Sequence, residues 1–205
     1  MFKATVMAIR WTVDPVRPEP GVIASAVDVL QRGELLILPT ETVYGLAADP
    51  EREGAVESIC RAKSRPGDKA VAFLVEGYDR LGSHGVFPDP RARMLAERYW
   101  PGPLTLVMES PKGFLGFRVP DHPVALAVLR GVGGPVAASS ANVSGEAPAL
   151  TADEAERSVG SSVAGILDAG PVAGGIPSTV IRVAGGRVDI LREGAISAAE
   201  IERTI

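Results

Sequence analysis

The segment RAKSRPGDK, residues 61–69, gathers four cationic side chains around a single carboxylate. Pro66 disfavours helical backbone at the residue before it, so we expect Lys63 and Arg65 to leave a helix in an extended stretch, where side chains two residues apart project to the same side. A guanidinium grips a phosphate through two oxygens, and an ammonium adds a mobile point charge. The spacing favours binding of a triphosphate or a departing pyrophosphate, although a solvated helix end is the commoner fate of a Lys-x-Arg pair.

The usual glycine-rich phosphate motifs are missing from the sequence. Neither G-x-x-x-x-G-K-[ST] nor a strand-coupled G-x-G-x-x-G occurs in the 205 residues. Those motifs carry phosphate charge on backbone N–H groups. If a nucleotide binds to this chain, we therefore expect side-chain cations to hold much of its charge.

Two hydroxyls and a carboxylate follow an aliphatic run in LLILPTETVYG, where Thr40, Glu41 and Thr42 come directly after Pro39. One interpretation is a strand that ends in a polar turn. The other is that the strand holds these groups at the floor of a site, because loops carried on the ends of buried strands are where α/β sheets place binding groups.

Small and polar residues dominate AASSANVSG, residues 137–145. Small side chains let a flat ligand lie close to the backbone, and Asn142 offers donors and an acceptor to a base or ribose edge. A tight Asx or Ser turn at the end of a strand explains the same segment equally well. Arg118, between LGF and VP, is either a surface strand residue or, if it faces inward, requires an anionic partner such as an amino-acid carboxylate.

Three other residues are not assigned a catalytic role. Cys60 lies on the apolar face of an expected helix and is interpreted as a packing residue. His122 could be a general base, but a satisfied or exposed turn histidine is the more common case. Tyr44, beside a glycine, is expected to cover an edge of the core.

Apolar runs alternate with helical stretches, which is typical of an α/β fold with a largely buried sheet. Strands are expected at residues 35–38, 71–75, 104–108, 135–138, 165–167, 179–183 and 188–191. Gly185 and Gly186 stand between the last two of these, a good signal for a hairpin, so the sheet should be mixed rather than wholly parallel.

Helices are indicated by apolar spacing and by end signals. Val56, Ile59 and Cys60 share one helical face, and a second helix should run from about residue 89 to residue 100, where a Pro-Gly pair stops it. Two later helix starts are marked by the capping-box pairs Thr151 with Glu154 and Ser197 with Glu200.

Composition limits the class of protein. With 205 residues, of which 46% are hydrophobic, the chain is long enough for one well-buried core. One cysteine and two histidines exclude a structural zinc cluster, and the net charge of −4 is unlike that of a dedicated nucleic-acid binder. No apolar run of membrane-spanning length and no signal peptide are present, so we expect a cytoplasmic protein without a membrane anchor.

Taken in order, LPTETVYGLAADP, KSRPGDK, PGPLTLV, FRVPDHP, SSANVSG, STVIRV and ILREGAIS closely resemble the motifs of the YrdC/Sua5 family of threonylcarbamoyl-AMP synthases. The resemblance runs from about residue 33 to the end of the chain. It implies a YrdC/RibB-like α/β fold of the α+β type, in which helices flank a twisted mixed sheet with a concave basic cleft. We expect residues 1–205 to form one such domain, without the C-terminal Sua5 domain of the longer form.

The resemblance also implies a nucleotidyltransferase reaction. L-threonine, bicarbonate or CO2, and ATP would give threonylcarbamoyl-AMP and pyrophosphate, the first step toward threonylcarbamoyladenosine in tRNA. Mg²⁺ would arrive with the ATP. The product would pass to a separate tRNA threonylcarbamoyl transferase complex, and we expect this chain to bind tRNA or double-stranded RNA weakly at most.

The matched motifs imply a role for particular residues. The threonine substrate would be bound by Thr42, Arg118 and Ser178, with Arg118 on its carboxylate. ATP would be bound by Arg65, Lys69, Ser140, Asn142 and Arg192. The catalytic cations, which would hold bicarbonate and the ATP phosphates, would be Lys63 and Arg65.

The sequence departs from the family pattern at Leu74, where many longer relatives have histidine, and at Phe114, where they often have a hydroxyl. The functions of those two positions are not transferred. Two rival hypotheses are a non-catalytic RNA-binding module with the same basic cleft and a paralogue that uses another carbamoyl or nucleotide substrate. The combination of Thr42, Lys63, Arg65, Ser140 and Asn142 favours the synthase.

Overall fold

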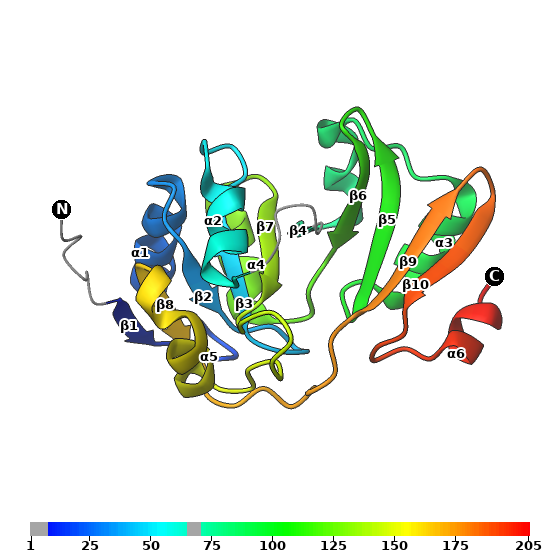
Figure 1. Cartoon of the computed structure of the whole chain (residues 1–205). Helices are drawn as coiled ribbons and strands as arrows, with labels where there is room; N and C mark the ends of the chain where they lie inside the picture. The colour runs from blue at the N-terminus through cyan, green and yellow to red at the C-terminus, as the bar shows by residue number, and fades with distance from the viewer. Residues whose placement is uncertain (1–7, 65–70) are drawn as a thin grey trace.

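A computed structural model describes residues 8–64 and 71–205, and the strands in this part of the chain form one twisted sheet (Figure 1). Ten strands follow the order β1-β8-β2-β3-β7-β4-β6-β5-β9-β10. Their bounds are β1 (Ile9–Thr12), β2 (Leu36–Leu38), β3 (Gly45–Ala48), β4 (Ala72–Leu74), β5 (Leu104–Ser110), β6 (Gly113–Arg118), β7 (Val136–Ser140), β8 (Gly165–Asp168), β9 (Thr179–Ala184) and β10 (Arg187–Arg192).

The sheet is mixed, as the sequence predicts. Strands β1, β8 and β2 run parallel, as do β4 with β6 and β5 with β9, whereas the remaining neighbours are antiparallel. The predicted hairpin is confirmed: β9 pairs with β10, and Ala184 lies opposite Arg187. Gly185 and Gly186 both have positive φ, 55° and 73°, the backbone that a tight two-residue hairpin turn requires.

Six α-helices and three short 3₁₀ segments lie in the described residues. The helices are α1 (Pro20–Gln31), α2 (Ala55–Ala62), α3 (Pro90–Tyr99), α4 (Pro123–Val132), α5 (Ala152–Val159) and α6 (Ala198–Glu202), and the 3₁₀ segments are η1 (Tyr78–Arg80), η2 (Gly82–His84) and η3 (Gly160–Ser162). Both predicted capping boxes are present, at the starts of α5 and α6. The helix expected at residues 89–100 is α3, which Asp89 caps.

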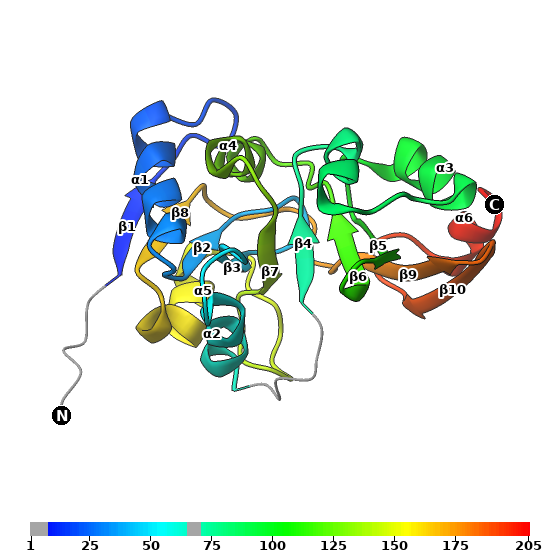
Figure 2. The same ribbon diagram turned by 90° about the horizontal axis from the view of Figure 1, so that it is seen from above.

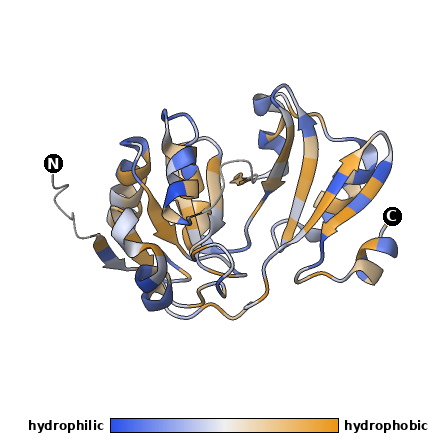
Figure 3. Ribbon diagram, viewed as in Figure 1, coloured by the Kyte–Doolittle hydropathy of each residue, from blue (hydrophilic) through white to orange (hydrophobic). Residues whose placement is uncertain are grey.

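The helices cover the two halves of the sheet differently (Figure 2). Over β2, β3, β7 and β8, α1 and α4 pack on one face and α2 and α5 on the other, around two hydrophobic clusters. Over β5, β6 and β9, a third cluster packs α3 on a single face. Figure 3 shows the strands largely hydrophobic and α5 mostly hydrophilic. Apolar burial therefore fixes the sheet while one face of its second half stays open.

Three strands and two helices were not among the expected elements: β1, β3, β6, α1 and α4. Strand β3 reads GLAA, and all four residues are buried, so it shows no polar alternation. Strand β6 contains two glycines, which obscure a strand pattern. Within the described residues, no helix combines the length and the apolar character needed to cross a membrane.

Candidate active site

A cleft of about 350 Å³ lies against the face of β5, β6 and β9 that is opposite α3, and we call it the central cleft. Its lining includes Thr42, Arg118, Ser140, Ser178 and Arg192. These residues come from segments far apart in the sequence, and the fold brings them together. No carboxylate lies among the described residues of the lining, so its charged groups are cationic.

Small side chains hollow the floor of the central cleft. Ala72 of β4 lies opposite Gly116 of β6 on one side and Ala138 of β7 on the other. A Cβ atom added at Gly116 would lie 3.2 Å from the Thr105 methyl carbon. Larger residues at these three positions would fill the space, so the small side chains on neighbouring strands leave room for a ligand.

Arg118 ends β6 with its side chain almost fully buried beside the central cleft. Its Nε donates to the Gly102 carbonyl at 3.1 Å, and its Nη2 donates to Glu41 Oε1 at 2.5 Å and to Thr42 Oγ1 at 3.0 Å. Of the two alternatives left open by the sequence, the structure shows the inward orientation, and the chain itself supplies an anionic partner, Glu41. A buried guanidinium held by fixed acceptors is oriented before any ligand arrives.

Thr40 and Thr42 are buried and hydrogen-bonded to one another at 2.9 Å between their Oγ1 atoms. Thr40 Oγ1 also lies 2.6 Å from the Val43 carbonyl oxygen. Both threonines line the central cleft, which places the polar end of LLILPTET at a site rather than in a solvated turn. Thr40 was not assigned a role from the sequence, although its spacing of two residues from Thr42 was visible.

Ser178 lies at the opposite wall, where its Oγ is 2.9 Å from Thr105 Oγ1. Arg192 Nη2 donates to the Ser178 carbonyl at 2.7 Å. Gly194 packs against the same backbone: a Cβ atom there would lie 2.6 Å from the Ser178 carbonyl carbon, too close for any side chain. Thr105 and Gly194 were not predicted, because their importance depends on contacts between distant segments.

Lys63 is buried behind Ser140, not extended toward solvent. It caps the end of α2 with φ of −88° and ψ of 1°, and Ser64 follows with a positive φ of 48°. The expected extended stretch is therefore wrong at these two residues. The cause is local: the Lys63 ammonium donates to the Ser140 and Asn142 carbonyls, and Ser144 N donates to the Lys63 carbonyl at 2.9 Å. The predicted residues Arg65 and Lys69 lie outside the described part of the chain.

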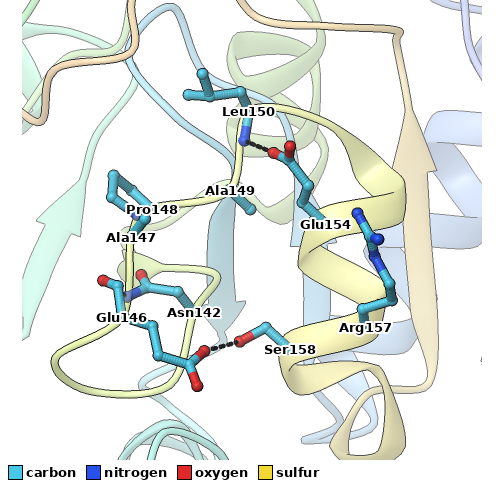
Figure 4. A pocket seen from close by; sticks show the side chains of 9 residues that line it. All are labelled: Asn142, Glu146, Ala147, Pro148, Ala149, Leu150, Glu154, Arg157 and Ser158. Carbon is cyan, nitrogen blue, oxygen red and sulfur yellow. Dashed lines mark hydrogen bonds between the residues drawn. The ribbon is translucent and has the colours of Figure 1, made fainter.

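Asn142 does not line the central cleft but a more open groove of about 560 Å³ (Figure 4). Its Nδ2 donates to the carbonyls of Val143 and Glu146, both at 2.9 Å. Glu146 in turn accepts a hydrogen bond from Ser158 of α5. The amide thus folds the loop after β7, as the Asx-turn alternative predicts, and its role in nucleotide binding stays a prediction.

The three residues without an assigned role have structural contacts. Cys60 is buried on α2, as expected. Burial raises the pKa of Tyr44 to about 12, so the hydroxyl stays protonated and donates to the Gly170 carbonyl at 2.6 Å. His122 is the N-cap of α4, a role that was not predicted, and its Nδ1 accepts from Val124 N at 3.2 Å.

His122 should make stability depend on pH. Burial lowers its pKa, and this outweighs the opposing effects of Glu41 and Asp121. Because the folded pKa lies below the unfolded value of about 6.5, the cap's contribution is present above that value and is lost as the pH falls through the folded pKa. His122→Asn keeps an acceptor that cannot titrate, so its urea-unfolding free energy should fall less between pH 7.5 and pH 5 than that of the wild type. Parallel declines would contradict this.

Comparison with known proteins adds independent information. The family model for Sua5, YciO and YrdC proteins, described as "Telomere recombination", matches residues 28–194. The chain is 37% identical over 211 residues to the threonylcarbamoyl-AMP synthase of Bacillus subtilis (strain 168), which covers 96% of this chain and 61% of that protein. It is 37% identical over 203 residues to a protein of Mycobacterium tuberculosis (strain ATCC 25618 / H37Rv), with 94% of this chain and 92% of that protein covered.

A solved structure supports the same relationship. The crystal structure of P. abyssi Sua5 complexed with L-threonine superposes with a TM-score of 0.91 at 33% identity, over 97% of this chain and 61% of that chain. The chain therefore spans less than two thirds of the Bacillus and Pyrococcus proteins and nearly all of the mycobacterial one.

Proposed function

Because the chain belongs to the Sua5/YciO/YrdC family, we propose that it is a threonylcarbamoyl-AMP synthase. It would combine L-threonine, bicarbonate or CO2, and ATP into threonylcarbamoyl-AMP and pyrophosphate, as the nucleotidyltransferase step of a tRNA modification. The observation that carries this proposal is the oriented Arg118 guanidinium beside the Thr42 hydroxyl in one cleft. A relative with the same fold has been solved with L-threonine bound.

The proposed threonine subsite lies between Arg118 with Thr42 and the Ser178 hydroxyl. Arg118 Nη1 makes no hydrogen bond to any described residue, so its donors are available to a substrate carboxylate. Arg–carboxylate pairs combine charge with two parallel hydrogen bonds. The proposed nucleotide subsite lies toward Ser140 and Arg192, with the Lys63 ammonium behind Ser140. Arg65 and Lys69 are proposed to complete it from the segment outside the described residues.

The proposed reaction needs positioning more than a protein nucleophile. The threonine nitrogen forms a bond to the carbon of CO2 and loses a proton, which yields a carbamate. A carbamate oxygen then attacks the α-phosphorus of ATP, the bond from that phosphorus to the bridging oxygen breaks, and pyrophosphate leaves. Cationic side chains fixed around the phosphates stabilise the charge that develops. A cleft lined by hydroxyls and guanidinium groups suits this chemistry.

Mg²⁺ is proposed to enter with ATP and to neutralise phosphate charge. In the described residues, no group of three His, Cys, Asp or Glu side chains could hold a metal ion. The hydroxyl and cationic lining fits an ion held mainly by the phosphates, because Mg²⁺ prefers oxygen ligands and commonly takes them from substrate phosphates. The adenylate product would be handed to a separate transferase complex that acts on tRNA. We propose a cytoplasmic location, because ATP and tRNA are both present there.

The decisive experiment measures pyrophosphate release by the purified chain from ATP. Release should require L-threonine and bicarbonate together, because the attacking carbamate does not exist without both. Equal release with threonine omitted would refute the synthase assignment.

The same assay separates the enzyme from the RNA-binding rival. Adenylate formation should proceed without tRNA. RNA should compete only weakly, because a few cations release few counterions on binding, and added salt should abolish the competition because it screens these contacts. An absolute requirement for tRNA, or tight RNA binding without adenylate formation, would favour an RNA-acting protein instead.

A further inference from the structure

The hydrogen bonds of the Thr40 side chain determine which way its hydroxyl proton points. A threonine hydroxyl has one proton to donate and can accept through its lone pairs, whereas a carbonyl oxygen only accepts. The 2.6 Å contact between Thr40 Oγ1 and the Val43 carbonyl oxygen therefore uses the only proton of Thr40. Every other hydrogen bond at Thr40 Oγ1 must be one that it accepts, including those from the N–H groups of Thr42 and Val43 at 3.3 Å.

The direction of the Thr42 hydroxyl follows from that of Thr40. Their Oγ1 atoms are 2.9 Å apart, and because Thr40 has no proton left, Thr42 is the donor. Arg118 Nη2, which cannot accept, donates to Thr42 Oγ1 at 3.0 Å. Thr42 therefore has its proton committed away from any ligand and keeps only acceptor capacity. Both threonines are at least 96% buried, so water does not compete freely for these hydrogen bonds.

We infer that Thr40 is a positioning residue that makes Thr42 an obligate acceptor and so selects an amino acid with a free α-amine. Resting on the proposed function, this assigns recognition of the α-ammonium to Thr42 Oγ1 and of the carboxylate to Arg118. An acceptor beside a guanidinium matches the two charged groups on the α-carbon of an amino acid. A phosphate or carboxylate oxygen cannot donate to Thr42, so Thr42 Oγ1 disfavours an anionic oxygen in contact with it and leaves the substrate carboxylate to Arg118.

The test compares the binding of L-threonine and of (R)-β-hydroxybutyrate, the analogue that lacks the amine, by isothermal titration calorimetry. The wild type should prefer threonine by roughly ten- to a hundredfold, the usual value of a hydrogen bond to a charged group. Thr42→Val should remove most of this preference, because the acceptor is gone. If Thr42 instead donates to the carboxylate, both ligands will weaken alike and their ratio will not change, which overturns the inference.

Thr40→Val and Thr40→Ser form the matched pair that tests the positioning role. Valine frees the Thr42 proton to turn toward the ligand, so the preference for threonine should fall about tenfold, whereas serine restores the hydroxyl and should keep the wild-type ratio. A wild-type ratio in folded Thr40→Val would overturn the role of Thr40. If Thr40→Val does not fold, Thr40→Ala, which also removes the hydroxyl, takes its place in the same comparison with Thr40→Ser.

The outcomes also separate this inference from the proposed function. If the wild-type chain binds no threonine and releases no threonine-dependent pyrophosphate, the proposed function fails and the inference falls with it. If threonine binds and turns over but the two ligands keep a constant ratio in all variants, only the inference is wrong.

Discussion

Glu41→Ala is expected to lower the free energy of unfolding by about 3 kcal/mol, because it leaves the Arg118 guanidinium buried without its carboxylate. The side chains of Arg118 and Glu41 are only 8% and 20% exposed, and Nη2 lies 2.5 Å from Oε1. Removing one member of a buried ion pair costs roughly 3–5 kcal/mol. We place this case at the lower end because the Gly102 carbonyl and Thr42 Oγ1 still accept from Arg118. Urea unfolding monitored by circular dichroism measures the effect.

An exposed pair provides the matched control. Arg182 and Asp189 approach to 2.7 Å on β9 and β10, but their side chains are 44% and 48% exposed. Asp189→Ala should therefore change the unfolding free energy by less than about 1 kcal/mol, since solvent screens such pairs. Equal losses at Glu41 and Asp189 would show that burial of the Arg118 pair contributes nothing.

A double variant separates the stability of this pair from its function. Glu41→Leu with Arg118→Met removes both charges together, so most of the lost stability should return, as it does when buried ion pairs are replaced by apolar residues. The folded double variant should nevertheless lack threonine-dependent pyrophosphate release, because the proposed carboxylate-binding group is gone. The pair would then be retained for ligand binding rather than for stability.

Much of the fold was predictable from local signals. Apolar runs located β2, β4, β5, β7, β8, β9 and β10, and both capping boxes marked real helix starts. These features depend on residues close together in the sequence, where propensity and side-chain hydrogen bonds act directly. Strand β3 was not predicted, because it is buried on both faces between β2 and β7. Its burial depends on its neighbours rather than on a pattern in its own residues.

Part of the candidate site was predictable as residues but not as contacts, since the predicted residues that line the central cleft are Thr42, Arg118, Ser140, Ser178 and Arg192. An inward Arg118 needs an anion on general grounds, yet nothing in the sequence shows that Glu41, 77 positions away, is that anion. Lys63 was expected in an extended stretch because Pro66 follows it in the sequence. The Ser140 and Asn142 carbonyls that hold its ammonium lie far away in the sequence and could not be taken into account. Contacts between distant segments depend on the sheet order, which local patterns do not encode.

Contacts between the backbones of distant segments are the part of the site that is hardest to predict from the sequence. Gly174 lies against the segment that carries Glu41 and Thr42, and Gly175 N donates to the Thr42 carbonyl at 2.9 Å. Gly174 belongs to the loop between β8 and β9, residues 169–178, which we call the backing loop. The Tyr44 hydroxyl holds the start of this loop, because it accepts from Ala169 N and donates to the Gly170 carbonyl. The backing loop therefore supports the backbone of Thr42, and Gly174 is required because there is no space for a side chain rather than because of turn geometry.

Gly174→Ala is expected to reduce kcat/KM for threonine by about a hundredfold, because misplacing reacting or binding groups by about 1 Å costs that much. A Cβ atom at Gly174 would lie 2.8 Å from Thr42 Cα and 2.9 Å from the Thr42 carbonyl oxygen, and closer still to the Glu41 carbonyl oxygen. All three are backbone atoms, so no side-chain rotation relieves the clash, and Glu41 and Thr42 must shift relative to Arg118. Initial rates of threonine-dependent pyrophosphate release, measured over a range of threonine concentrations, test this.

Gly21→Ala is the control for the chemical change itself. Gly21 lies in the first turn of α1, where an added Cβ meets nothing within 4 Å, so alanine should leave kcat/KM unchanged and stabilise the helix by less than about 1 kcal/mol. The KM for ATP in Gly174→Ala should change much less than the KM for threonine, because the displaced segment belongs to the proposed amino-acid subsite and the proposed nucleotide subsite is built on Ser140 and Arg192. A wild-type threonine KM in Gly174→Ala would show that the backing loop moves freely and that Thr42 does not depend on it.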